Sequence, residues 1–317
     1  MEECMSVFVD ELARQRALDT YHLVDSLPEA AYDDITRVAS ALCGVPIALI
    51  SLIDRDRQWF KARTGLAATQ TRRDEAFCDH AIREPDRLME VPDALGDARF
   101  VDNPLVTGEL GIRFYAGMPL VTPGGAPIGT VCVIDREPRE LNEAQREGLA
   151  SLARLTMNLM EARHRERELE RAAFLASAVP EPVPVAPSID HSAFTVAIFE
   201  VQDLAGAGAR LGERAAERVV LDLENALHDG LRPGSGDSAS RATGSAEVIV
   251  VLHGKDVGDA LQRLQERVFA FERETGLHVL SGHADSEAAN ERVESVFLRA
   301  DIALSQQKDV YWAGLTS

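Results

Sequence analysis

Apolar runs and polar breaks predict a series of strands in the first half of the chain. Phe114–Val121 and Ile128–Ile134 are apolar runs separated by a Pro-Gly-Gly segment, a pattern typical of a β-hairpin with a short connection. Ile47–Ile53 is another apolar run and predicts a buried strand, and Gln58–Ala62 predicts the strand that follows it. These segments indicate a mostly antiparallel sheet.

Helical periodicity precedes and follows these strands. Residues 8–42 are predicted to be helical, and their last turns follow the three-and-four spacing of an amphipathic helix. The apolar face of those turns consists of Ile35, Val38, Ala39 and Leu42. Helices packed on a mostly antiparallel sheet predict an α/β sandwich for this part of the chain.

Residues 142–178 have the composition of one long helix. An imperfect heptad seam is interrupted by Glu166 and consists of Leu152, Leu155, Leu159, Ala162 and Leu169. The later part, Arg163–Arg171, is rich in charge and is expected to be solvated. Two interpretations remain open: the helix closes the first domain, or it pairs with a second copy as a signalling helix.

The segment at 179–190 contains four prolines and predicts a semi-rigid linker between two domains. Beyond it, strands are expected at 193–203, 247–252 and 278–282, and helices at 214–228, 257–275 and 293–308. This β-α-β-α-β-α order is typical of a ferredoxin-like or cyclase-like α/β domain. A length of 317 residues also favours two domains.

Charge and cysteine content narrow the classes of function. A formal charge of −19 argues against binding to nucleic acid or to anionic membrane surfaces. No apolar run approaches the roughly 20 residues that span a bilayer, and the acidic N-terminus lacks the basic region of a signal peptide, so a cytoplasmic location is expected. The four cysteines form no CxxC, and the histidines show no metal-ligand spacing, so no metal is expected.

Residues 20–165 resemble a GAF domain, a small-molecule sensor module of bacterial signalling. The stretches ALISLIDRDRQWFKARTGL, AFCDHAI and IRFYAGMPLVTPGGAPIGTVCVID carry the resemblance, together with the helix that begins LNEAQREG. The resemblance implies a GAF-type antiparallel sheet sandwiched by helices and a small-molecule ligand of unknown identity. Residues 1–19 then form an N-terminal helical extension.

The resemblance also suggests which residues line the ligand pocket: Trp59, Phe60, Phe77, Cys78, His80, Phe114, Tyr115 and Cys132. The alternative for the aromatic side chains is that they fill the core. Cys78 has three interpretations, which are an inert buried thiol, a redox thiol and an attachment point for a tetrapyrrole. A GAF subgroup reduces free methionine sulfoxide with several cysteines, but only Cys78 and Cys132 are available here.

Residues 191–317 resemble the GGDEF domain of diguanylate cyclases, which condense two GTP molecules into cyclic di-GMP across a dimer. The closing helix ADIALSQQK is similar to the family's ADxALYxAK. RATGSAEVIVVLHG falls where RxGGDEFxxLLPG is expected. The signature itself reads Gly244, Ser245, Ala246, Glu247 and Val248.

This resemblance implies that several catalytic positions have been lost. Metal-assisted phosphoryl transfer needs carboxylates that hold Mg²⁺ against the phosphates. Glu200 takes the place of the family's first metal ligand, but the second is Ala246, whose methyl group binds no cation. Ser245 replaces a glycine at a turn where backbone approaches phosphate.

Other positions of the family pattern are partly kept. Glu217 replaces one of the two guanine-binding residues, and Gly208 stands at the other. Lys308 matches the phosphate-binding lysine, whereas Trp312 replaces an arginine. The inhibitory RxxD motif is also missing. Arg232 is followed by Gly234 and Ser235, and Asp237 is out of spacing.

The sequence therefore favours a cytoplasmic bacterial signalling protein that is not an enzyme. Its GAF domain would sense a small molecule or a partner and control a degenerate GGDEF domain that acts through homodimerisation, a signalling partner or nucleotide binding. No cofactor is expected. Two alternatives remain: an active diguanylate cyclase that uses Mg²⁺, and an effector that binds GTP or cyclic di-GMP without turnover.

Overall fold

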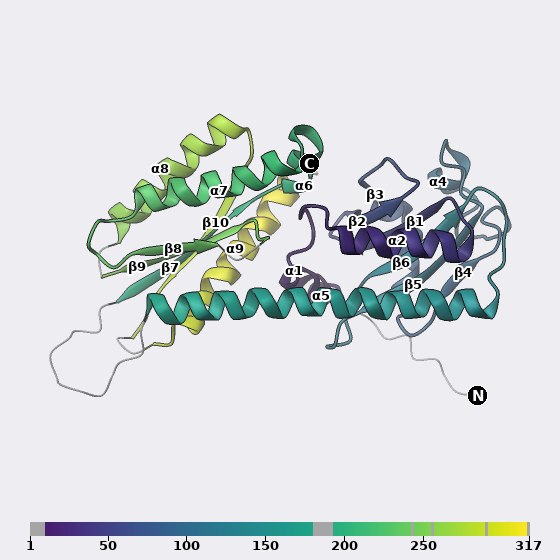
Figure 1. Cartoon of the computed structure of the whole chain (residues 1–317), viewed down its shortest axis with the longest axis horizontal. Helices are drawn as coiled ribbons and strands as arrows, with labels where there is room; N and C mark the ends of the chain where they lie inside the picture. The colour runs from purple at the N-terminus through teal and green to yellow at the C-terminus, as the bar shows by residue number, and fades with distance from the viewer. Residues whose placement is uncertain (1–9, 180–192, 242–243, 255–256, 289–290, 316–317) are drawn as a thin grey trace. The chain divides into compact units, whose positions relative to one another are not determined.

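The computed structural model describes residues 10–179, 193–241, 244–254, 257–288 and 291–315 (Figure 1). Within this range the chain divides into two compact units. Unit 1 contains residues up to 24 and 28–164, and unit 2 contains residues 25–27 and those from 165 onward. The linker expected at 179–190 lies outside the described residues except for Val179, and Cys4 also lies outside them.

Unit 1 is built on a six-stranded antiparallel sheet with the order β3-β2-β1-β6-β5-β4. Its strands are β1 (Ile47–Ile53), β2 (Arg57–Thr64), β3 (Gln70–Arg72), β4 (Met89–Val91), β5 (Phe114–Val121) and β6 (Pro127–Asp135). The predicted hairpin is confirmed as β5 and β6, and Gly125 closes its turn with a φ of 84°. Glycine adopts such a positive φ without steric cost.

The helices of unit 1 correct part of the sequence interpretation. They are α1 (Glu11–Thr20), α2 (Ala30–Cys43), α3 (Phe77–Ala81), α4 (Pro104–Thr107) and the first part of α5 (Glu143–Ala178). The helical prediction over 8–42 is confirmed for α1 and α2 but is wrong at residues 21–29, which are irregular and in which His22 and Asp25 adopt positive φ. Residues 8 and 9 lie outside the described residues. Non-glycine residues rarely adopt such φ values, and they end helices.

The buried face of α2 also differs from the predicted one. Its buried residues are Tyr32, Thr36, Ala39 and Cys43, whereas Val38 and Leu42 are exposed. Thr36 turns inward because its hydroxyl oxygen accepts a hydrogen bond from Thr64 Oγ1 on β2, at 2.9 Å. The prediction from apolar spacing therefore selected the neighbouring face of α2 instead of the buried one.

Unit 2 is built on a four-stranded antiparallel sheet with the order β10-β7-β9-β8. Its strands are β7 (Phe194–Val201), β8 (Ser238–Arg241), β9 (Glu247–His253) and β10 (Val279–Asp285), and its helices are α6 (Leu204–Leu211), α7 (Glu213–Gly230), α8 (Gly258–Thr275) and α9 (Val293–Leu315). The three expected strands are present. Strand β8 and helix α6 were not predicted, because SASR lacks an apolar pattern and α6 is short.

Both faces of this second sheet are covered. Ala197 and Phe199 of β7 belong to an apolar core with residues of α6, α7 and α8. Val196 and Ile198, which alternate with them, belong to a second core with α9 and with Leu175 near the end of α5. Successive side chains of a strand point to opposite faces, so β7 contributes to both cores.

Helix α5 confirms the single long helix expected over 142–178. The expectation that Arg163–Arg171 is solvated is wrong for one residue, because Arg167 is only 7% exposed. The predicted heptad seam of α5 does not lie on one buried face, since Leu152 is buried while Leu155 and Leu169 are 57% and 72% exposed. No helix among the described residues combines the length and apolar character that crossing a membrane requires.

Candidate functional site

The aromatic residues predicted to line a GAF pocket are buried. Phe60, Phe77 and Tyr115 belong to one apolar core of unit 1 together with Cys78 and Cys132. Phe77 stacks on Phe100 with ring centroids 3.9 Å apart. Trp59 and Phe114 are also buried, but not among the residues of that core.

A surface cavity lies beside this core instead of within it. Its volume is about 330 Å³, and it is lined by His80, Ala81, Glu84, Arg87, Leu88, Met89, Glu90 and Arg99. His80 is the only predicted pocket residue among them, and its ring packs edge-on against Phe100 at 4.9 Å. The arginines of this cavity were not singled out from the sequence, because each lies in an ordinary polar stretch.

Polar groups gather around two sulfur atoms inside the core of unit 1. The Sγ atoms of Cys78 on α3 and Cys132 on β6 lie 3.7 Å apart. Thr130 Oγ1 donates to Cys78 Sγ at 3.1 Å, and Tyr115 Oη donates to the same atom at 3.3 Å. Ser51 Oγ lies 3.9 Å from Cys132 Sγ. All five side chains are buried, and we call them the thiol cluster.

The thiol cluster shifts the pKa values of its two thiols in opposite directions. Burial by itself would raise the pKa of Cys78, but hydrogen bonds from Cys132, Thr130 and Tyr115 outweigh it and lower that pKa. The hydrogen bond to Cys78 and burial raise the pKa of Cys132. Donors that surround one sulfur favour its thiolate, so Cys78 is the acidic thiol of the pair.

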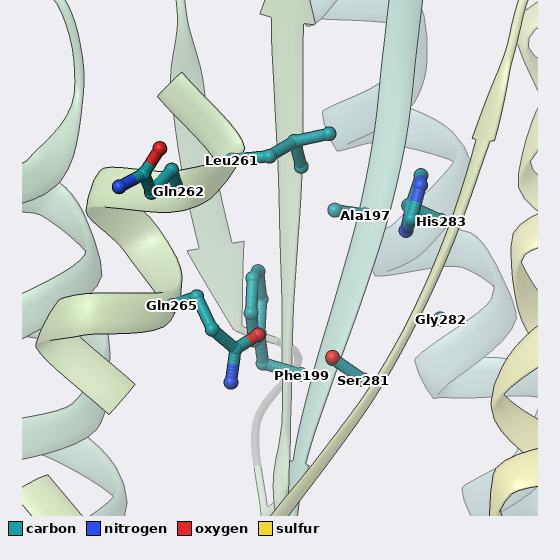
Figure 2. Close-up of a pocket in the computed structure, with 8 residues that line it drawn as sticks. All are labelled: Ala197, Phe199, Leu261, Gln262, Gln265, Ser281, Gly282 and His283. Atoms are coloured by element: carbon teal, nitrogen blue, oxygen red, sulfur yellow. The ribbon is translucent and has the colours of Figure 1, made fainter. Parts of the chain in front are cut away.

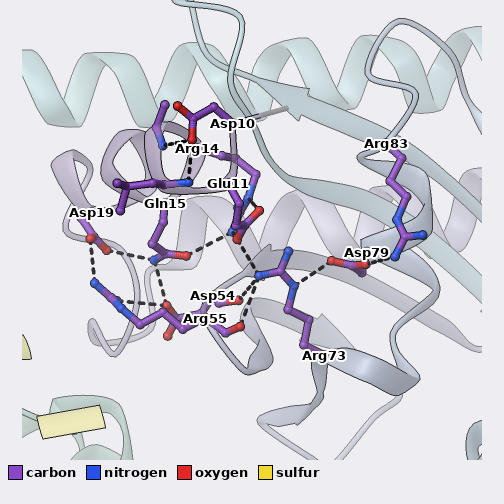
Figure 3. A network of polar contacts seen from close by, with 12 residues as sticks. Asp10, Glu11, Arg14, Gln15, Asp19, Asp54, Arg55, Arg73, Asp79 and Arg83 are labelled. Carbon is purple, nitrogen blue, oxygen red and sulfur yellow. Dashed lines mark hydrogen bonds and ion pairs between the residues drawn. The ribbon is translucent and has the colours of Figure 1, made fainter. Parts of the chain in front are cut away.

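A network of ion pairs holds α3, the short helix that carries Cys78, against neighbouring elements (Figure 3). Asp79 of α3 accepts from Arg73 Nε at 2.7 Å and from Arg83 Nη2 at 2.6 Å. Arg73 also pairs with Glu11 of α1 at 2.6 Å, and Glu11 pairs with the buried Arg14. The network therefore restrains α3 from outside, while the thiol cluster contacts it from inside.

In unit 2 the changed signature places two carboxylates side by side. Glu200 of β7 and Glu247 of β9 are paired in register, and carboxylate oxygens of the two lie within 4.8 Å of each other. Lys308 Nζ of α9 donates to Glu200 Oε2 at 2.6 Å, and Gln202 Nε2 donates to Glu200 Oε1 at 3.0 Å. The lysine thus neutralises the carboxylate that the GGDEF resemblance assigns to a metal-ligand position.

The second carboxylate is paired with an arginine that sequence reasoning missed. Arg167 Nη2 of α5 donates to Glu247 Oε2 at 3.1 Å and to Ser245 Oγ at 2.6 Å. Ser245 Oγ also accepts from the Glu247 N–H at 3.0 Å. The hydroxyl that the signature gained by replacing glycine is therefore used to bind Arg167, and no local sequence signal links positions 167 and 245.

The residues at the place of the inhibitory motif bind each other. Arg232 donates to both carboxylate oxygens of Asp237, at 2.7 and 2.8 Å, and the His253 N–H donates to Asp237 Oδ1 at 2.9 Å. The Asp237 side chain is fully buried. Position 235 is a serine, so no RxxD begins at Arg232, and the sequence spacing did not reveal this ion pair.

Acid is expected to weaken unit 2 through Asp237. Burial alone would raise its pKa, but hydrogen bonds from Arg232, His253 and Ser235 lower it to about 2. A lowered folded-state pKa contributes stability that is present above the unfolded pKa and lost as pH falls toward 2. We expect the free energy of unfolding, measured with urea, to fall between pH 5 and pH 2 by about 2 kcal/mol less in Asp237→Asn than in the wild type. Asp229→Asn, at an exposed position of α7, is the matched control and should keep the wild-type profile.

The other predicted positions of unit 2 lie apart from this group. Glu217 is exposed on α7, whereas the Glu200 carboxylate accepts its hydrogen bonds from Lys308 and Gln202. Gly208 is buried within α6, where an added Cβ would lie 3.1 Å from Leu27.

A separate cavity of about 240 Å³ lies between α8 and β10, where Figure 2 shows glutamine, serine and histidine side chains around it. Its lining residues are Ala197, Phe199, Leu261, Gln262, Gln265, Ser281, Gly282 and His283. None of them is a residue predicted from the GGDEF resemblance.

Comparison with known proteins agrees with the fold of unit 1. The family model of the GAF domain matches residues 27–159. A Pseudomonas aeruginosa protein named cyclic di-GMP phosphodiesterase PA2567 is 46% identical over 149 residues, which are 47% of this chain and 25% of that protein. This chain thus spans about a quarter of the length of the curated relative that it matches.

Two solved structures are also similar to parts of the chain. One is a microbial GGDEF domain studied with bis-(3′,5′)-cyclic di-GMP, at 24% identity and a TM-score of 0.37, covering 46% of this chain and 87% of that chain. The other is the GAF domain of an Acinetobacter phosphoenolpyruvate-protein phosphotransferase, at 16% identity and a TM-score of 0.36, covering 49% of this chain and 95% of that chain.

Residues 27–159 are therefore a GAF domain. The fold class expected from the sequence is confirmed, since both units have antiparallel sheets covered by helices. Unit 2 resembles a GGDEF domain through its closing helix and the position of its signature, which reads Gly244-Ser245-Ala246-Glu247-Val248.

Proposed function

We propose that this chain is a cytoplasmic signalling protein whose GAF domain takes an input and whose GGDEF-like unit transmits it without catalysis. The sequence similarity to a protein named cyclic di-GMP phosphodiesterase supports a place in cyclic di-GMP signalling. The input would be a small molecule or a partner protein. The output would be a changed contact with a second copy, a protein partner or a nucleotide.

One observation carries the non-enzymatic part of this proposal. Both acidic side chains at the signature end of the sheet hold internal cations, Lys308 on Glu200 and Arg167 on Glu247. The position that the GGDEF resemblance gives to the family's second metal ligand is Ala246. Phosphoryl transfer depends on metal positioning and charge neutralisation, and the methyl group of Ala246 cannot supply the oxygen ligand that Mg²⁺ requires.

A homodimer through α5 is part of the same proposal. Leu155 and Leu169 are exposed and lie two heptads apart, with Ala162 exposed midway between them. Apolar residues at this spacing pair helices in coiled coils, and Glu166 within the seam would weaken the pairing.

The proposal predicts that the purified protein makes no cyclic di-GMP from GTP and Mg²⁺. The measurement is chromatography of the reaction mixture, with light scattering on the same sample to establish that the protein is a folded dimer. Product that disappears in Glu200→Ala would instead identify an active cyclase whose metal site is rebuilt from Glu200 and a ligand foreign to the family. The matched control is Asp229→Ala, because Asp229 is exposed on α7 and has no place in the family's nucleotide or metal pattern.

Calorimetry with GTP and with cyclic di-GMP separates the two forms of a non-enzymatic output. Heat of binding without turnover would identify a nucleotide effector. An absence of binding at high nucleotide concentration would leave protein contact as the output.

A further inference from the structure

We propose that Cys78 is a reactive thiol and that peroxide oxidation joins it to Cys132 in a disulfide inside the GAF domain. The contact between the two sulfur atoms carries the inference. They lie 3.7 Å apart, and a disulfide bond is about 2.0 Å long, so the atoms must approach by about 1.7 Å. Cys78 belongs to a five-residue helix. The ion pairs that hold this helix from outside involve the partly exposed Arg73 and Arg83, so it can shift by that amount more easily than the centre of a sheet.

The hydrogen-bond donors around Cys78 supply the second line of support. Thr130 and Tyr115 both donate to its sulfur, and the Cys132 thiol is placed to donate when Cys78 loses its proton. Thiolates, and not thiols, attack peroxides. The pKa of Cys78 is lowered and that of Cys132 is raised. Cys78 is therefore the thiol that attacks the peroxide, and Cys132 then attacks the oxidised Cys78 sulfur.

The glycine at position 117 makes this arrangement possible. A Cβ on Gly117 would lie 2.1 Å from Tyr115 Oη and 2.7 Å from Tyr115 Cζ, so any other residue there would displace the tyrosine ring. The absence of a side chain there leaves the tyrosine hydroxyl free to reach Cys78. A buried tyrosine hydroxyl requires a partner, and in this core the partner is sulfur.

The reaction balances with hydrogen peroxide as oxidant. The Cys78 thiolate attacks one peroxide oxygen, the O–O bond breaks, and protonation of the departing oxygen gives water and a sulfenic acid. The Cys132 sulfur then attacks the Cys78 sulfur, the S–O bond breaks, and a second water leaves. Two thiols are oxidised to one disulfide, and one peroxide is reduced to two waters.

The solvent cavity beside α3 offers the oxidant a route. His80 and Ala81 of the same helix line that cavity of about 330 Å³, so a small opening of α3 exposes the thiol cluster to it. This inference concerns the GAF domain alone, and only its role as an input signal rests on the proposed function.

Differential alkylation of the full chain before and after peroxide treatment tests the proposal. Trypsin releases Cys78 in residues 74–83 and Cys132 in residues 114–136. We expect mass spectrometry to find these two peptides linked in the non-reduced digest. We also expect Cys78 to react at least about tenfold faster than Cys43, because the thiolate is the reacting form. Cys43 is the comparison thiol, since it is also buried and burial raises its pKa to about 11.

Three variants make the test decisive. Cys132→Ser should stop the reaction at a sulfenic acid on Cys78 that dimedone traps. Tyr115→Phe should slow the oxidation of Cys78 by about three- to tenfold, because the sulfur loses one hydrogen-bond donor. Cys43→Ser should leave the linked peptide unchanged. Folded protein in which Cys78 reacts no faster than Cys43 would overturn the reactive thiol. Oxidised Cys78 without the linked peptide would overturn the disulfide. Neither outcome depends on what unit 2 does with GTP.

Discussion

Replacing Arg167 with alanine is expected to lower the free energy of unfolding of unit 2 by about 3 kcal/mol. Arg167 is buried on α5 and donates to Ser245 and Glu247. Its removal leaves the Glu247 carboxylate without this cation while that carboxylate still lies beside Glu200. Breaking a buried pair from one side costs more than removing the pair, because the remaining charge stays desolvated.

The measurement is urea unfolding followed by tryptophan fluorescence. The chain has two tryptophans, and Trp59 lies in unit 1 while Trp312 lies in unit 2, so a Trp59→Phe background reports on unit 2 alone. The control is Arg165→Ala, two positions earlier on the same helix and exposed. Equal midpoints for the two variants would show that Arg167 contributes no more than a surface charge.

A second large effect is expected at Gly282 of β10. A Cβ at this position would lie 2.3 Å from the Leu304 backbone nitrogen and 2.4 Å from the Ala300 carbonyl oxygen, both on α9. Backbone atoms cannot rotate away as side chains do, so Gly282→Ala must push α9 from the sheet. We expect a loss of about 3 kcal/mol in the free energy of unfolding of unit 2, because the apolar core under α9 opens.

Hydrogen exchange measured by mass spectrometry locates this effect. Protection should fall in β10 and α9 and stay unchanged in unit 1. Gly314→Ala is the matched control, because an added Cβ there meets no atom within 4 Å, and a helical alanine should stabilise α9 by up to about 1 kcal/mol. Wild-type protection in Gly282→Ala would mean that the sheet and α9 are less closely packed than described.

Local patterns predicted the elements with the strongest signals. The hairpin of β5 and β6, the long helix α5 and the strand β9 follow from apolar runs and helical composition. Strand β8 reads SASR and carries no such signal, because its place in the sheet comes from pairing with β9. The buried face of α2 was mispredicted for a similar reason, since Thr36 is buried by its contact with Thr64, a partner 28 positions away.

In the candidate sites, too, some residues could be assigned from local sequence, whereas the contacts between them could not. Position 246 could be assigned from the signature, and Glu200 and Lys308 from their places in the family pattern. The ion pair between Glu200 and Lys308 spans 108 positions, and the hydrogen bond from Arg167 to Ser245 spans 78. A charge-rich helical stretch usually faces solvent, so nothing local marked Arg167 as the exception.

The sequence by itself determined the two-domain order, the GAF domain and the changed signature, because each depends on the identity of residues within short segments. The loss of one metal carboxylate at position 246 stays a prediction from the GGDEF resemblance. The tertiary structure alone decided which charges neutralise each other and which thiols meet. Cys78 and Cys132 are 54 positions apart and come together only when α3 packs on β6. Burial then gives hydrogen bonds and ion pairs an energetic weight that they lack in water, so the chemistry of both sites depends on packing as much as on residue type.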